Sequence, residues 1–380
     1  MKRRNKKEKA SFLIKFLIFL NFIAAFSLLI SYLALYISPA KFWAIAFFGL
    51  SCYFLIITNV IFLVFWIFKR KKVFLLSLIS ILIGWNHIGN LFQIQFKSCD
   101  NVQSEHISIM SYNVNIFDIY NEWGRFDKKD KIIKLIGEKK PDILCLQEFA
   151  YHSDGGEIST IESIGDVLEN HEYYVEFTFT AKKISHFGSI IFSKYPIINQ
   201  GKIVFSSESG NNSLFIDIKI NEDTIRIYNV HLQSIRMKPE DYRFAKDISQ
   251  IKNINKQEKI NKNLIGILSR IKHAFIKRAP QAEHLKDHIK NCPYPAIVCG
   301  DFNDTPSSYA YHQIIDGFKD AFVECGSGMG KTYLGVFPSF RIDYILYDPK
   351  FTAESFNTLS YKYSDHYPVF CKLQLDLENN

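Results

Sequence analysis

Acidic side chains are almost absent from the first quarter of this chain. Residues 1–96 contain one acid, Glu8, and 12 Lys or Arg, whereas residues 97–380 contain 34 Lys or Arg and 37 acids. Residues 1–96 therefore have a net charge of +11 and the remainder a net charge of −3, so the basic excess behind the formal charge of +8 lies in the N-terminal part. Duplex binders usually carry a basic face. Because the basic excess of this chain lies outside the downstream part, the overall basicity is no evidence for nucleic-acid binding by that part.

Metal-ligand spacing is absent from the seven cysteines. Cys52 lies in an apolar N-terminal run, and Cys145 and Cys299 lie in short apolar runs typical of buried strands. The other four show no paired spacing, which excludes a recognisable zinc site: Cys99, Cys292, Cys325 and Cys371. An oxidising compartment would permit a disulfide, although the sequence does not select a pair.

A nucleotide-binding phosphate loop is also missing. The segment from Gly326 to Thr332 has a similar composition, but Cys325 occupies the position of the first required Gly. The residues that follow, 332–337, have an extended pattern and do not predict a helix. We therefore expect no nucleoside triphosphate binding here, although Lys331, Thr332 and Tyr333 are candidates to line a cleft. Internal repeats and low-complexity tracts are absent as well.

Long apolar runs are present at the N-terminus. After a basic tail, residues 1–11, the sequence predicts a transmembrane region over 12–96 with helices at about 12–37, 42–68 and 73–92. Each of the first two exceeds the roughly 20 residues that a spanning helix needs. The third is weaker because it contains polar residues suited to an interface, Trp85, Asn86, His87 and Asn90. The first run is too long for a signal peptide and lacks a small-x-small cleavage site.

The placement of basic residues predicts an orientation. The basic stretches at 2–9 and 69–72 should lie in the cytoplasm. A third span would then place the rest of the chain outside, in a periplasm or at the cell exterior. If the third segment is only interfacial, the downstream domain is cytoplasmic. We expect a multi-pass protein whose catalytic domain is extracytoplasmic.

The downstream part has the pattern of an α/β domain. Residues 97–106 are polar and are interpreted as a linker, and 107–380 as the catalytic domain. Helical runs such as 128–140, which Pro141 stops, interleave with strands and predict a mixed structure with helices on its outer faces. The expected strands are rich in β-branched and aromatic residues: 107–113, 143–147, 173–179, 188–193, 214–220, 224–230, 296–300, 341–347 and 369–375.

One segment of the domain, residues 232–290, is basic. It contains 14 Lys or Arg and six acids, a net charge of +8, and apolar residues recur in it at helical spacing. We interpret it as a helical, lid-like excursion between two strands of the site. Two interpretations of its charge stay open: a solvated basic helix pair, or a contact with an anionic membrane or substrate.

Short polar motifs end many of the apolar runs. They contain Asn113, Glu148, His231, Asp301 with Asn303, Asp343, and Asp365 with His366. Carboxylate and amide oxygens bind hard divalent cations, and a His beside an Asp can move protons. Each motif also has a simpler interpretation: a structural ion pair for Glu148, a helix cap near Pro306 for Asn303 and Asp304, and a structural residue for His231.

As a set and in order, these residues resemble the endonuclease/exonuclease/phosphatase superfamily from about Ile107 to Leu375. That superfamily includes pancreatic-type deoxyribonucleases, apurinic/apyrimidinic endonucleases, inositol polyphosphate 5-phosphatases and neutral sphingomyelinases. The resemblance implies a four-layer α/β/β/α sandwich and in-line attack of water on phosphorus that depends on Mg²⁺ or Mn²⁺. It implies that Glu148 and Asp365 bind the metal, with help from Asn113.

The resemblance also implies catalytic roles. Asp301 and Asn303 would position the nucleophile and the phosphate, and His366 would pair with Asp343. Independently of the resemblance, the place of His231 beside the other motifs makes it a candidate acid or transition-state donor. Two features depart from the apurinic endonucleases: they have an Asp where this chain has Asn115, and they lack a His at the position of His231.

Three functions follow as hypotheses. The first is a membrane-anchored, divalent-metal phosphoesterase, with lipid headgroups among its candidate substrates and membrane lipids as partners. The second is a nuclease of the same fold that acts on extracytoplasmic nucleic acid, which the charge of −3 disfavours. The third is a catalytically inactive binding module, which the complete set of metal, Asn and His–Asp positions disfavours. The sequence indicates no protein partner.

Overall fold

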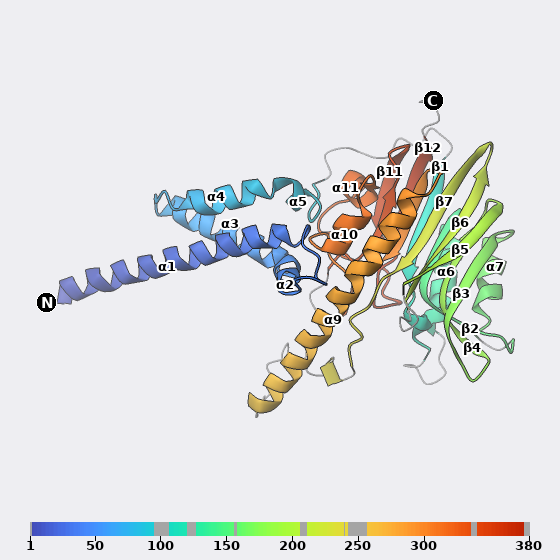
Figure 1. Ribbon diagram of the computed structural model, residues 1–380, viewed down its shortest axis with the longest axis horizontal. Coiled ribbons are helices and arrows are strands. Elements are labelled where there is room, and N and C mark those ends of the chain that lie inside the picture. The colour runs from blue at the N-terminus through green and yellow to red at the C-terminus, as the bar shows by residue number, and fades with distance from the viewer. Residues whose placement is uncertain are drawn as a thin grey trace.

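The computed structural model describes residues 2–94, 106–119, 127–155, 158–205, 211–238, 240–241, 257–335 and 340–375. Figure 1 shows two parts, a group of elongated helices at the N-terminal side and an α/β sandwich beside it. Most of the expected linker at 97–106, and the expected helical positions at 242–256, lie outside the described residues.

The N-terminal part contains α1 (Lys2–Leu33), α2 (Ala44–Leu50), α3 (Cys52–Phe68), α4 (Phe74–Ile83) and α5 (Trp85–Gly89). Among the described residues, one helix is long and apolar enough to cross a membrane, Phe12–Leu33. The prediction of a single helix over 42–68 is wrong, because α2 and α3 are separate helices that meet at an angle of 61°. This bent pair provides a second membrane span only if both helices together cross the membrane as one span. The third expected helix is interrupted at Gly84, and its apolar part, α4, has only ten residues.

Close packing surrounds Gly84, where α4 ends. A Cβ at this position would lie 2.0 Å from Cζ of Tyr32, so only Gly allows α4 to pass the ring. The hydroxyl of Tyr32 also donates to the carbonyl of Ser80, at 3.1 Å. Polar side chains inside the bundle pair in the same way, since Asn21 donates to Ser77 Oγ at 2.7 Å and Asn59 donates to the carbonyl of Ala24 at 3.0 Å.

The outward faces of these helices are apolar. Phe12 is 73% exposed, Ile61 63% and Phe68 82%. A large exposed apolar surface of this kind is the arrangement that a lipid environment favours, because apolar side chains there contact lipid instead of water.

The sandwich consists of two sheets with six strands each. The first has the order β11-β12-β1-β2-β4-β3 and the second β5-β6-β7-β8-β10-β9. The strands of the first sheet are β1 (His106–Asn113), β2 (Ile143–His152), β3 (Glu172–Ala181), β4 (Ser185–Ser193), β11 (Phe351–Thr358) and β12 (Val369–Leu375). Those of the second are β5 (Ile197–Val204), β6 (Asn212–Ile220), β7 (Asp223–His231), β8 (Ala296–Asp301), β9 (Lys319–Asp320) and β10 (Asp343–Tyr347).

Aliphatic residues from both sheets form the central core, among them Ile109 and Ile143 of the first sheet and Ile227 and Ile297 of the second. On the outer face of the first sheet lie α6 (Asp127–Lys139) and α7 (Thr160–Leu168). On the outer face of the second lie α9 (Gln257–Lys290) and α10 (Tyr309–Ile314) (Figure 1). This confirms the predicted α/β/β/α sandwich.

Three strands were not expected from the sequence: β5, β9 and β11. Each lies at the edge of its sheet. β5 and β11 alternate poorly between buried and exposed residues, and β11 contains a register shift at Ala353/Ser355. Edge strands lack the apolar pattern of central strands, because they are covered less completely.

The helices are docked on the sandwich through the segment that precedes β10. Arg341 is fully buried, and it donates to Oδ2 of Asp320 at 2.6 Å and to the carbonyl of Asn90 at 2.8 Å. Gln93 forms a β-bridge with Gly328, and the rings of Tyr53 and Phe340 lie 5.7 Å apart. The N-terminal helices and the domain therefore share packed, buried contacts.

We expect Arg341→Leu to destabilise the protein by about 3–5 kcal/mol, because the substitution leaves the Asp320 carboxylate buried without its cation. Asp320 keeps its hydrogen bonds from the Tyr311 hydroxyl, at 2.8 Å, and from the Phe322 amide, at 2.9 Å, so the fold should survive. Chemical unfolding of the full chain in detergent measures the change. Lys350→Leu, at an exposed turn, is the control, and equal stability of the two variants would contradict the expectation.

Candidate active site

The predicted site residues converge at the ends of the central strands. Asn113 ends β1, while His231 and Asp301 end β7 and β8 and are direct partners in the parallel register. Asp343 begins β10 and is the antiparallel partner of Asp301. The amide of Asn113 donates to Oδ2 of Asp301 at 3.0 Å, and this bond joins the two sheets.

Asp301 is held in one orientation by amide donors. Besides Asn113, it accepts from the side-chain nitrogen of Asn303 at 3.0 Å and from the backbone nitrogen of Asn303 at 2.7 Å. Asn303 adopts a left-handed conformation, φ 54°, which this turn requires. Gly300 has φ 138°, and a Cβ there would lie 2.0 Å from the carbonyl oxygen of Val230. The Gly-Asp-x-Asn motif therefore serves to fix this carboxylate.

Burial raises the pKa of Asp301 to about 6; Asp343 adds to the effect, while His366 and His231 oppose it. A carboxylate with a raised pKa is a better proton acceptor than an ordinary one. The alternative role of Asn303 and Asp304 as helix caps is wrong, because Ser308 caps α10 by accepting from the amide of Tyr311.

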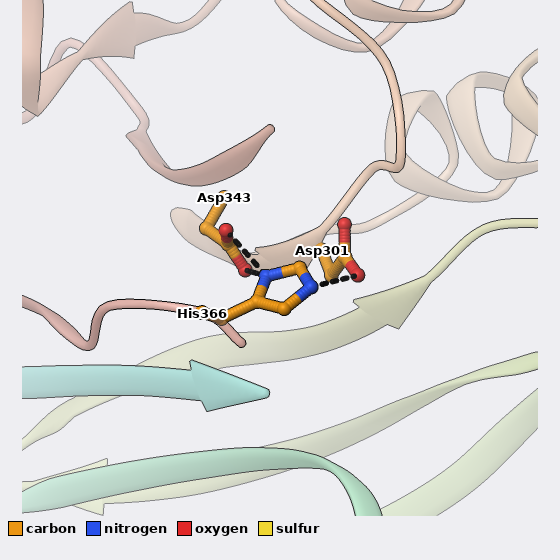
Figure 2. Close-up of side chains that lie close together, drawn as sticks. All are labelled: Asp301, Asp343 and His366. Carbon is orange, nitrogen blue, oxygen red and sulfur yellow. Dashed lines mark hydrogen bonds and ion pairs between the residues drawn. The ribbon is translucent and has the colours of Figure 1, made fainter. Parts of the chain in front are cut away.

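The ring of His366 lies between two carboxylates, as Figure 2 shows. Its Nδ1 is 2.9 Å from Oδ2 of Asp343, and its Nε2 is 3.8 Å from Oδ2 of Asp301. Burial disfavours its charged form, but Asp343 and Asp301 outweigh this and raise the pKa of His366 well above its usual value. The imidazole is therefore cationic, with both N–H groups directed toward carboxylates.

Asp301, Asp343 and His366 also place one potential ligand atom each within 4.8 Å of one another, a spacing that suits a metal ion. We interpret the cluster as a proton-handling group because both ring nitrogens of His366 face carboxylates, Nδ1 toward Asp343 and Nε2 toward Asp301.

Glu148 and Asp365 are the carboxylates that fit a cation. Burial and the charge of Asp365 raise the pKa of Glu148, with His366 and the Asn113 amide opposing them. Glu148 adopts φ 49°, and no Lys or Arg among the described residues pairs with it, which disfavours a structural ion pair. Ser364 donates to the carbonyl of Asn113 at 2.8 Å and to Oδ1 of Asp365 at 3.3 Å, so Asp365 is tied to the end of β1. The carboxylates of Glu148 and Asp365, together with the amide of Asn113, form a donor set that suits a hard divalent ion.

His231 presents an unsatisfied nitrogen to the same place. Its Nε2 lies 3.6 Å from Oε1 of Glu148 and 3.9 Å from Oδ2 of Asp301, and it makes no hydrogen bond to the described residues. Burial lowers its pKa, so the ring is neutral near pH 7. A buried, unpaired imidazole nitrogen at this position can meet a substrate oxygen.

A cavity of about 390 Å³ opens at this centre. Glu148, Asn303, Asp365 and His366 line its polar end, and a smaller cavity of about 230 Å³ reaches Glu148 and His231 from another direction. The larger cavity has further lining residues that the sequence did not suggest, from α2, α3 and α9: Leu50, Phe54, Ile271 and Phe275. No sequence pattern connects these helices to the motifs.

The expectation for Lys331, Thr332 and Tyr333 is only partly correct. Tyr333 lines the cavity, and its ring lies 5.3 Å from that of His366 at 69°. Thr332 instead is buried and its hydroxyl oxygen accepts from the backbone nitrogens of Ile342 and Asp343, which fixes the start of β10. Lys331 is exposed and does not line the cavity.

Residues 110–366 match the family model described as "Endonuclease/Exonuclease/phosphatase family", and residues 14–91 match one described as a domain of unknown function. A solved endonuclease/exonuclease/phosphatase from Bacteroides vulgatus is 16% identical, with a TM-score of 0.52, covering 72% of this chain and 100% of that one. The mannosyl-6-phosphatase of Bacteroides thetaiotaomicron is also 16% identical, with a TM-score of 0.50 and coverage of 71% and 100%. At these identities the likeness concerns the fold. No curated protein matches the chain.

Proposed function

Because this chain belongs to the endonuclease/exonuclease/phosphatase family, we propose that it is a membrane-anchored, divalent-metal-dependent hydrolase of phosphate esters. The observation that carries the proposal is the convergence of Asp301, fixed by three amide donors, with the His366–Asp343 pair beside two carboxylates. The family acts on ester bonds, and each group here matches a need of phosphoester hydrolysis.

The metal would be Mg²⁺ or Mn²⁺, held by Glu148 and Asp365 with help from the Asn113 amide. Such an ion, when bound, neutralises charge on the phosphate and polarises its oxygens. The donor set supports this assignment, since the mutual repulsion of Glu148 and Asp365 falls when a cation lies between them.

The remaining residues act on water and substrate. Asp301 orients the attacking water and accepts its proton, a role that its raised pKa supports. Cationic His366, oriented by Asp343, stabilises the negative charge that develops nearby. His231 offers a hydrogen bond from its unpaired Nε2 to a phosphoryl oxygen. Asn303 fixes Asp301 and presents its amide at the cavity wall.

We expect Glu148→Gln to weaken the apparent affinity for Mg²⁺ by at least about tenfold, because a neutral amide replaces a metal-binding carboxylate. Activity of the full chain is measured against Mg²⁺ concentration after treatment with EDTA, with bis(p-nitrophenyl) phosphate as substrate. Glu222→Gln, whose side chain is fully exposed, is the control. An unchanged Mg²⁺ dependence in Glu148→Gln, or full activity in EDTA, would refute the metal assignment.

The orientation that we propose places the domain outside the cytoplasm. In Figure 1, α1 runs toward the domain, α3 runs away from it and α4 returns, so the basic stretches 2–9 and 69–72 both lie at the far end. The tendency of basic residues to stay in the cytoplasm supports an extracytoplasmic domain and a multi-pass anchor. The disulfide at Cys325 supports the same compartment, since such bonds persist in oxidising surroundings.

Cys292 provides a test of this topology. It is a free, partly exposed thiol, whereas the other free cysteines of the described residues are buried. A membrane-impermeant maleimide added to intact spheroplasts should therefore label the wild-type chain and not Cys292→Ser. Labelling that requires lysis would place the domain in the cytoplasm.

The basic segment supports contact with the membrane surface. Only part of it is described, as one long helix, α9, whose Leu264, Ile265 and Leu268 are exposed beside α2. Lys272 lies 4.4 Å from the ring centre of Trp43 at this junction. A helix that presents basic and apolar side chains beside a membrane anchor is typical of helices that lie at the membrane surface. We therefore favour membrane contact of α9 over a solvated helix. A nuclease on extracytoplasmic nucleic acid stays the alternative.

A further inference from the structure

The cavity at the active site has a wall made by the N-terminal helices. Leu50 at the end of α2, Ser51 at the bend and Phe54 on α3 line the same cavity as Glu148 and His366. These residues come from the part of the chain that the proposed function assigns to the membrane. The anchor therefore forms part of the substrate cavity.

The other apolar walls come from the catalytic domain. Ile271 and Phe275 on α9, with Phe340 and Ile342 before β10, line the cavity together with Leu50 and Phe54. The lining thus combines carboxylates and His366 with aliphatic and aromatic side chains. A ligand that fills it needs a phosphate group joined to an apolar group.

Specific contacts hold this wall in place. A Cβ at Gly49 would lie 2.7 Å from the carbonyl oxygen of Ser307, so the glycine allows α2 to approach the domain. The rings of Phe47 and Phe275 lie 5.5 Å apart at 88°, and Tyr53 packs on Phe340. The bend between α2 and α3 places α2 against the domain while α3 leads away from it (Figure 1).

The apolar wall continues into the outer surface of α3. Phe54 is 52% exposed, and Ile57 and Ile61, which follow it on α3, are 54% and 63% exposed. If α3 lies in a bilayer, an apolar chain can pass from the lipid along this surface into the cavity without crossing water. A nucleic acid, polar along its whole length, gains nothing from such a path.

We propose that this cavity binds the apolar tail of a lipid phosphate ester, with the tail against Leu50, Phe54, Phe275 and Phe340 and the phosphate at the polar end. The proposal rests on the proposed function and specifies its substrate class. It makes Leu50 and Phe54 of the anchor specificity-determining residues for a reaction whose chemistry lies in the domain.

The test compares esters that differ only in the alkyl chain. Methyl p-nitrophenyl phosphate and hexadecyl p-nitrophenyl phosphate release the same chromophore, and both are presented to the full chain in nanodiscs with Mg²⁺. We expect kcat/KM of the wild type to be at least about tenfold higher for the hexadecyl ester, because burial of methylene groups contributes to transition-state binding.

Leu50→Trp, which fills the cavity, should remove most of this preference, because it should lower kcat/KM for the hexadecyl ester more than for the methyl ester. Leu82→Trp, the same change on the exposed surface of α4 and outside the cavity, should keep the preference. Phe54→Ala, with Phe68→Ala as its control, gives a second measurement if Leu50→Trp does not fold.

The outcomes separate the two proposals. Equal kcat/KM for both esters in the wild type, or a preference that survives both Leu50→Trp and Phe54→Ala, would overturn the tail site while the phosphoesterase stands. Absence of metal-dependent hydrolysis of either ester would overturn the proposed function and the tail site with it.

Discussion

Asp301→Asn should lower kcat by about 10³-fold or more, since loss of a positioned proton acceptor removes a factor of 10²–10⁴ and the new amide cannot accept from all three donors. The substitution preserves size, so the loss would report on chemistry. Turnover of bis(p-nitrophenyl) phosphate at saturating Mg²⁺ measures it.

In the wild type, kcat should fall as pH drops through the raised pKa of Asp301, about 6, because only the ionised carboxylate accepts a proton.

A matched control for Asp301→Asn exists just after the neighbouring strand β10. Asp348 follows β10 at the end opposite to Asp343 and lies outside both cavities. Asp348→Asn should keep wild-type activity. If Asp301→Asn folds normally, by thermal unfolding and circular dichroism, and keeps more than about a tenth of the wild-type kcat, the role of Asp301 is wrong.

Asp343→Asn should lower kcat by about 10²–10³-fold and shift the alkaline limit of activity to lower pH. The physical reason is that Asp343 raises the pKa of His366, and its contact of 2.9 Å keeps the imidazole cationic. The folded pKa of His366 is above its unfolded value, so the stabilisation from this pair is complete at low pH. It is lost as pH rises through the folded pKa, and the substitution brings that loss to lower pH.

Full pH–rate profiles of the wild type and Asp343→Asn test this. His366→Ala should lose activity to a similar degree, and the double variant should be little worse than either single one, because the two residues act as a unit. Strictly additive losses, or an alkaline limit that does not move in Asp343→Asn, would show that His366 acts independently of Asp343.

The chemistry-bearing residues could be predicted because polar groups that end buried strands stand out in sequence. Glu148 follows the apolar run 143–146 and Gln147, and Asp301 follows another apolar run with a Gly at the turn, so the expected burial of these carboxylates pointed to function. The mixed α/β structure with helices on its outer faces followed from the alternation of such runs with helices, whereas the two-sheet sandwich was implied by the family resemblance. What each residue does stays a prediction, including the assignment of Asn113, Glu148 and Asp365 to the metal.

The shape of the cavity could not be predicted. Leu50 and Phe54 belong to an apolar run whose composition fits any membrane helix, and their place beside His366 depends on a bend at Ser51 and on the close approach of Gly49 to Ser307. Contacts between segments so distant in the chain leave no local periodicity. For the same reason, the sequence did not predict the buried hydrogen bond from Arg341 to the carbonyl of Asn90.

Helix lengths at the N-terminus were overestimated for a related reason. Hydropathy counts apolar residues but does not detect where a helix ends inside an apolar run, as α4 does at Gly84 beside the ring of Tyr32. The structure accordingly has α4 and α5 where one helix over 73–92 was expected. Whether this broken segment crosses the membrane is what the labelling of Cys292 decides.

The most direct test of the central claim is turnover by the purified full chain in nanodiscs, with and without Mg²⁺, on a panel of phospholipid, sugar phosphate and duplex DNA. We predict Mg²⁺-dependent hydrolysis of lipid phosphate ester, none in EDTA, and none by Asp301→Asn. Mg²⁺-dependent cleavage of DNA without lipid turnover would instead establish the nuclease. Absence of any metal-dependent turnover would contradict the assignment of this site as a phosphoesterase centre.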